Sequence, residues 1–168
     1  MKSHLFAVAA GLAFVAGPSI ALDVAGYRAI VGETVMAINA GDVDVAHLVG
    51  LQEQLIAMGV AGAEEYAADA PDHAELMRFV AKSAPAMTEL TLEEIEPAWH
   101  EGEAFAEVGI DVHDLDHFGP AVSHMDAIIH PATAVIALRA YAASGDEDHL
   151  DQVIDELSEV VEHLSYIE

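Results

Sequence analysis

Cysteine is absent from all 168 residues of the sequence, and this absence removes several kinds of site at once. Zinc sites built from thiolates, thiol nucleophiles and covalent haem attachment through a CxxCH motif all require cysteine. Disulfides are excluded for the same reason, so the fold must be stabilised by packing. The sequence also lacks a G-x-S-x-G elbow and a glycine-rich phosphate loop, so serine catalysis and nucleotide binding have no motif to support them.

Basic residues are scarce, with 5 Lys and Arg against 30 Asp and Glu and a formal net charge of −25. This balance argues against a nucleic-acid partner, because binding phosphates requires cationic side chains that displace counterions. Attraction to anionic lipid is disfavoured for the same reason. Two interpretations of the acidity stay open: a solvated surface that keeps the chain soluble in salt, or a surface that attracts cations or a basic protein partner. The first explains better why Lys82 is the only lysine after residue 21.

The first residues follow the order of a secretory signal peptide. Lys2 supplies a positive start, residues 5–16 form an uncharged apolar run, and small residues precede a cleavage point after Ala21. An uncleaved anchor is the alternative, but the run is shorter than the roughly 20 residues that a spanning helix needs. The sequence therefore predicts a signal peptide over 1–21 and a periplasmic or secreted mature domain of residues 22–168, without stable membrane insertion after cleavage.

Helical periodicity dominates the rest of the chain, and no run of alternating polar and apolar residues predicts a strand. Start and stop signals divide it into segments that begin at Asp23, Asp42, Pro71, Thr91, Ala121 and Asp146. Short connections between strong helices are typical of a bundle. We expect one all-α domain, an antiparallel helical bundle of four main helices with one or two short extra helices.

Two of these segments have an unusual distribution of polar residues. Residues 121–144 are apolar on nearly all sides, which predicts a helix at the centre of the bundle. The terminal helix is strongly amphipathic, and its polar side carries His149, Glu156 and His163. We expect that side to face solvent.

Histidine and aspartate gather in residues 111–131, which hold four of each. His113 and His117 are four residues apart, the spacing that places two imidazoles on one side of a helical turn. Imidazole suits Zn, Cu, Ni and Fe. The alternative is helix capping, because the same D-x-x-H spacing occurs at Asp44 and at Asp146, and the Asp146 instance opens an expected helix.

His130 is the most informative of these histidines because the central helix is expected to bury it, and a buried ring must find partners. Asp126 lies one turn earlier and could fix the tautomer, which would leave the other ring nitrogen for a metal. His124 is about 120° around the helix from His130, so both cannot face one ion on a straight helix. A core histidine bonded only to protein would give the same pattern. Pro131 removes the amide that would bond to the Ala127 carbonyl.

A second candidate lies on the segment that begins with the capping-box pattern of Thr91 and Glu94, which we expect to form one helix as far as Gly109 with a kink at Pro97. Its acidic residues and His100 follow one stripe: Glu93, Glu96, His100, Glu103 and Glu107. This stripe opposes the apolar side, so a solvated face is the favoured interpretation. A carboxylate–histidine metal oxidase would instead require these glutamates to point inward.

Two resemblances follow from these features. The export signal, the length and the helical pattern resemble the periplasmic cytochrome c-prime type of bundle, which implies architecture alone because CxxCH is absent. The H-x-x-E at His100 and Glu103 resembles iron-linked periplasmic imelysin-like proteins, over four residues only. Neither resemblance assigns a role to a residue.

The sequence favours a non-enzymatic, exported protein that binds a divalent transition metal, Cu or Zn, for carriage, buffering or sensing. The predicted metal ligands are His100, His113, His117, His124, Asp126 and His130. The alternative is an acidic protein-interaction or structural module without metal, whose partner would be a basic protein.

Overall fold

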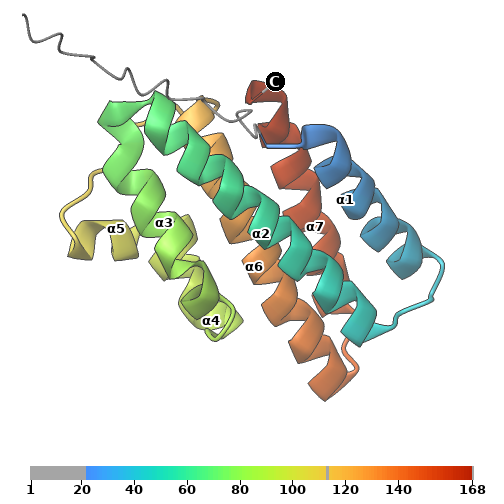
Figure 1. Cartoon of the computed structure of the whole chain (residues 1–168). Coiled ribbons are helices and arrows are strands. Elements are labelled where there is room, and N and C mark those ends of the chain that lie inside the picture. Colours follow the sequence, from blue (N-terminus) through green and yellow to red (C-terminus); the bar gives the residue numbers. More distant parts are fainter. Residues whose placement is uncertain (1–21, 113, 168) are drawn as a thin grey trace, which may run out of the picture.

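The computed structural model describes residues 22–112 and 114–167, and within this part of the chain the structure is helical without strands (Figure 1). The all-α prediction is therefore confirmed. The α-helices are α1 (Val24–Asn39), α2 (Val45–Asp69), α3 (Ala74–Met87), α4 (Leu92–Ile95), α5 (Glu103–Glu107), α6 (Pro120–Ser144) and α7 (Asp148–His163). Short segments η1 (Pro71–His73), η2 (Glu96–His100) and η3 (Leu164–Tyr166) complete the described fold. The predicted signal peptide and His113 lie outside the described residues.

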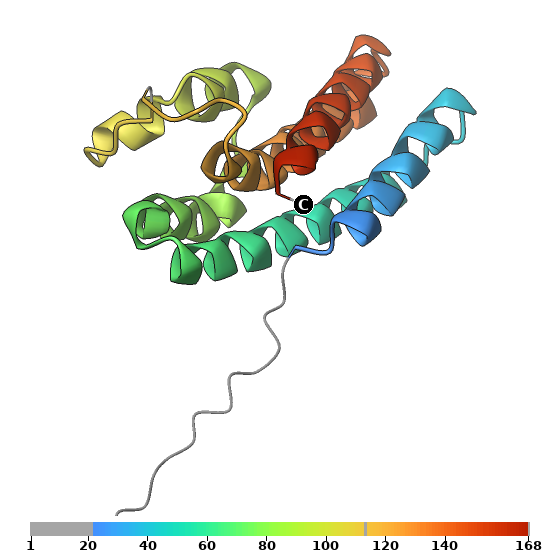
Figure 2. The ribbon, with the colours of Figure 1, turned by 90° about the horizontal axis from the view of Figure 1, so that it is seen from above.

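Helix α6 is the central element, as its apolar sequence predicts. It packs against α2, α3, α4 and α7, and Figure 2 shows it between the α3–α5 group and the pair α1 and α7. Among the described helices, α6 alone is long and apolar enough to cross a membrane, but 89% of its apolar window is buried by the rest of the protein. The finer prediction, an antiparallel bundle of four main helices, is not specifically confirmed, because the packing involves five helices of 14 to 25 residues.

Two hydrophobic clusters lie on opposite sides of α6. One joins α3, α5 and η2, where the Trp99 and Phe105 rings meet edge to face at 5.3 Å. The other joins α1, α2 and α7, with Leu48, Leu55 and Leu157 fully buried. Because α6 contributes to both clusters, the polar side chains of its buried part, such as His130 and Thr133, are held between packed helices.

Helix capping explains several of the aspartates. The Asp23 carboxylate accepts a hydrogen bond from the Gly26 amide at 2.9 Å, and Asp44 accepts one from the His47 amide at 3.2 Å. The capping box of Thr91 is also present, since Glu94 accepts from its amide at 2.9 Å. The capping interpretation of the D-x-x-H spacing is thus confirmed at Asp44.

The expected single helix from Thr91 to Gly109 is wrong. Helix α4 gives way to the π-helical segment η2 at Glu96, immediately before Pro97, and the chain then turns at Gly102 with φ 86° before α5. Proline lacks an amide hydrogen, and a positive φ is reached readily only by glycine. The stripe predicted from α-helical spacing therefore does not exist as one face.

Pro131 creates a second local requirement, inside α6. It has no amide to donate to the Ala127 carbonyl, and the Tyr27 hydroxyl of α1 donates to that carbonyl instead, at 3.0 Å. Helix α2 approaches the same carbonyl through Gly59, where an added Cβ would clash with it. Three helices thus meet at the carbonyl beside His130.

We expect Gly59→Ala to destabilise the protein by about 1–3 kcal/mol, because the new methyl group must displace the α6 backbone. Gly50→Ala is the matched control on the same helix: its Cβ meets nothing within 4 Å, so it should stabilise by about 0.5–1 kcal/mol through helix propensity. Urea unfolding measures both. Equal stability of the two variants would contradict the close contact.

Candidate metal centre

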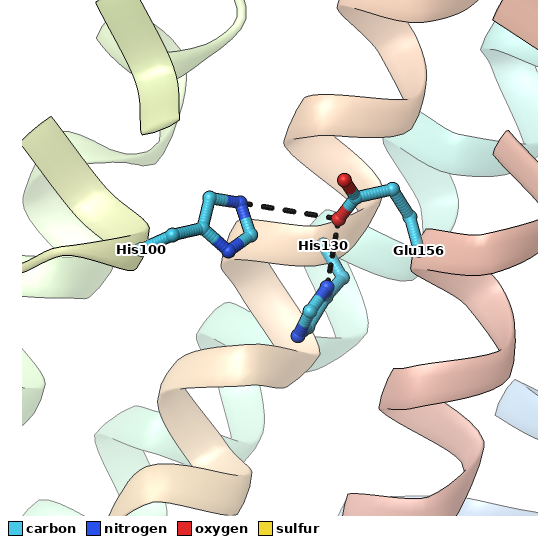
Figure 3. Close-up of side chains that lie close together, drawn as sticks. All are labelled: His100, His130 and Glu156. Carbon is cyan, nitrogen blue, oxygen red and sulfur yellow. Dashed lines mark hydrogen bonds and ion pairs between the residues drawn. The ribbon is translucent and has the colours of Figure 1, made fainter. Parts of the chain in front are cut away.

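Three side chains from three separate elements converge beside α6: His100 at the end of η2, His130 in α6 and Glu156 in α7 (Figure 3). One nitrogen or oxygen atom from each lies within 4.8 Å of the other two. His130 Nδ1 is 2.8 Å from Glu156 Oε2, and His100 Nε2 is 3.9 Å from the same oxygen. The side chains are only 5%, 12% and 18% exposed for His130, Glu156 and His100.

The π-helical turn is what brings His100 into this group. The Glu101 amide bonds to the Glu96 carbonyl, five residues back, at 3.0 Å. A π turn holds an extra residue, so side chains beyond it rotate away from the positions that α-helical spacing predicts. His100 consequently lies inward, with Nε2 3.0 Å from the Thr133 hydroxyl of α6. Its predicted position on a solvated face is therefore wrong.

Glu156 is the candidate metal ligand that the sequence interpretation missed. Together with His163 it was expected to face solvent, yet this side of α7 packs on α6, and His163 is only 5% exposed. His130 requires a hydrogen-bonding partner in the core, and the closest one is Glu156, not Asp126: Asp126 Oδ1 is 4.0 Å from His130 Nε2. One signal was available, because Glu156 and His163 are two helical turns apart and share a face with apolar neighbours.

Burial sets the charge of these groups. Desolvation lowers the pKa of His130 to about 4, and it also lowers the pKa of His100, where Glu156 acts in the opposite direction. Desolvation raises the pKa of Glu156 and of Asp126 to about 7 in each case. Both imidazoles are neutral at pH 7, so each has a lone pair to offer a metal.

Two imidazoles and one carboxylate are a well-suited donor set for a divalent transition metal. Zn²⁺ takes nitrogen and oxygen ligands of this kind, and a set of three protein ligands leaves at least one coordination position open. His100 and His130 also line a cavity of about 620 Å³, so an open position can face that space. The described residues therefore have the donors, burial and room to hold a metal ion.

The structure separates His124 from the cluster but places His117 and Asp126 on the cavity that His100 and His130 also line. His124 is buried away from the cluster, where its ring stacks on Tyr66 at 4.8 Å, and it lines a different, smaller pocket. His117 is exposed in the turn before α6 and lies at the cavity wall, with Asp126 further along the same wall. His113 lies outside the described residues, so its expected pairing with His117 stays a prediction; residues 114–117 form turns and a bend.

The glutamates that a metal oxidase would require are not among the three clustered side chains. Glu93, Glu96 and Glu103 are all exposed, which agrees with a solvated face for the acidic residues of this segment. The carboxylate of the cluster comes from α7 instead.

In comparisons with known proteins, no family model, curated protein or solved structure matches this chain. The fold and the site together define an all-helical protein with a buried His/Glu cluster that can hold a metal ion. The function proposed for the protein rests on that cluster.

We expect Glu156→Gln to stabilise the metal-free protein at alkaline pH. Because the pKa of Glu156 is raised from 4.5 to about 7, the folded chain keeps a proton that the unfolded chain releases between these values. Stability is therefore lost as pH rises through this window, and the loss persists above it. Glutamine cannot ionise, so the gain should be absent below pH 4 and reach up to about 3 kcal/mol above pH 7.

Thermal unfolding of chelator-treated protein across pH 4–8.5 measures this difference. Glu103→Gln removes an exposed carboxylate and is the control, for which we expect no such pH-dependent gain. A Glu156→Gln variant that is less stable than wild type at pH 8 would contradict a buried, strained carboxylate.

Proposed function

We propose that this chain is an exported helical-bundle protein that binds a divalent transition metal through His100, His130 and Glu156, for carriage, buffering or sensing. One observation carries the proposal: three donor side chains from η2, α6 and α7 lie within 4.8 Å of one another while largely buried. Chance proximity of acidic groups is common on an acidic surface, but these groups lie between packed helices.

The donor set favours Zn²⁺ or Cu²⁺ as the ion. Imidazole nitrogen binds both well, and the chain has no thiolate to select a softer ion. Among the described residues that line the adjoining cavity, none is a serine, tyrosine or lysine, which favours a binding role over covalent catalysis. In this proposal the partner is the metal ion, and neither nucleic acid nor a membrane takes part.

The ligand assignment predicts which histidines matter. Isothermal titration of the mature chain, residues 22–168, with Zn²⁺ and Cu²⁺ should show that His100→Ala and His130→Asn weaken binding at least tenfold. His47→Ala is the matched control, because His47 is exposed and pairs with Glu33 on the surface, and it should change affinity less than twofold. Circular dichroism of each variant checks that the helices still form.

Equal affinity in folded variants of all three positions would remove the site. The acidic surface would then be the functional feature, and the alternative, an interaction module for a basic protein partner, would be tested by the salt dependence of its association.

Export is tested separately, by producing the full chain in a bacterial host. We expect the periplasmic fraction to contain a protein whose intact mass corresponds to residues 22–168, because the small residues before Leu22 suit signal peptidase. Full-length protein that stays in the membrane fraction would support the uncleaved anchor instead.

A further inference from the structure

Asp126 and His163 form a second polar contact in the same cavity, and the three residues of the first cluster do not account for it. His163 Nδ1 lies 3.1 Å from Asp126 Oδ2, a contact between α7 and α6 that is one turn along α6 and two turns along α7 from the His130–Glu156 contact. His163 is 95% buried, and its Nδ1 has no hydrogen-bond partner despite this short distance. A buried nitrogen without a partner carries a desolvation cost that native structures seldom leave unanswered.

The separation of these two atoms fits neighbouring ligands of one metal ion. Bonds from a transition metal to imidazole nitrogen and carboxylate oxygen are about 2.0–2.2 Å long, so two ligands at roughly a right angle lie about 3 Å apart. The unpaired nitrogen and the facing oxygen are therefore spaced so that one ion could bind both of them. Without a metal, a hydrogen bond requires either a ring N–H directed at the Asp126 carboxylate or a protonated Asp126 that donates its O–H to Nδ1.

A third donor is available beside them. The His117 ring meets the His163 ring edge to face, with centroids 5.0 Å apart, and both line the cavity. His117 is exposed in a turn, so its ring can rotate toward Asp126 without disturbing the core.

The charge of the cavity suits a cation. Asp126, Glu159, Glu162 and Glu101 line it, and none of the described lining residues is Lys or Arg. Asp126 is the largely buried carboxylate of this set, whereas the other three are exposed to solvent. Its volume of about 620 Å³ has room for a second hydrated ion.

We propose that the protein holds two divalent metal ions in this cavity, the second bound by Asp126 and His163 with His117 as the third ligand. His130 separates the two positions: Nδ1 faces Glu156 in the first, and Nε2 faces Asp126 in the second. The ring centroids of His130 and His163 are 6.4 Å apart, so the two ions are close neighbours. This second site extends the proposed function but uses ligands of its own.

Metal stoichiometry tests the inference, with Zn²⁺ as the probe. Native mass spectrometry and titration in 0.5 M NaCl, which screens the acidic surface, should give two tightly bound equivalents for the mature wild-type chain. His163→Phe keeps a ring against Phe118 but removes both nitrogens, and we expect it to bind one equivalent with the first affinity changed less than threefold. Glu156→Gln should bind one equivalent in the second site, and His47→Ala should bind two.

A paramagnetic probe adds a distance-sensitive readout. Two equivalents of Cu²⁺ should give a dipolar-coupled electron paramagnetic resonance signal in the wild type and an isolated Cu²⁺ signal in His163→Phe.

Each of the remaining outcomes would overturn the first site, the second site or both. A single equivalent that is lost in Glu156→Gln and kept in His163→Phe overturns the second site and leaves the first. A single equivalent that is lost in His163→Phe and kept in Glu156→Gln overturns the first site, and with it the proposal of two ions. No tight equivalent in folded wild type overturns both.

Discussion

The burial of α6 on all sides is the constraint on which the rest of the structure depends. A helix placed between two hydrophobic clusters can keep polar side chains only if neighbouring elements supply their partners. The Thr133 hydroxyl contacts His100 Nε2, His130 Nδ1 contacts Glu156 Oε2, and Asp126 Oδ2 faces His163 Nδ1. The candidate metal centre thus consists of polar residues on α6 and of the partners that α7 and η2 supply to them.

Acid and base exchange their ordinary roles in this environment. Desolvation raises the pKa of Glu156 and Asp126 to about 7 while it lowers that of His130 to about 4. Without a cation, the carboxyls hold protons near neutrality and the imidazoles do not. A divalent ion bound here would take the place of those protons and would accept lone pairs from both kinds of side chain, so its binding would offset the cost of burying these groups.

Local features of the fold could be predicted from the sequence, because they depend on residues close together in the chain. The caps at Asp23, Asp44 and Thr91 and the burial of residues 121–138 are of this kind. The inward direction of His100 could not be predicted. Pro97 indicates a break in the helix, but it does not indicate how far a π turn rotates the side chains that follow. Glu156 was missed because its spacing places it only beside the apolar residues of α7, and the rotation of α7 against α6 decides whether such a position is buried.

The bond from the Tyr27 hydroxyl to the Ala127 carbonyl links residues 100 positions apart and ends within one turn of His130. The three ligands of the cluster are themselves 30 and 26 residues apart, so the unfolded chain offers no local chelating pair among them. Assembly of the cluster therefore requires the tertiary packing of η2, α6 and α7. A protein that crosses a membrane unfolded would carry no metal through these ligands, and it would acquire its ion only in the compartment where it folds.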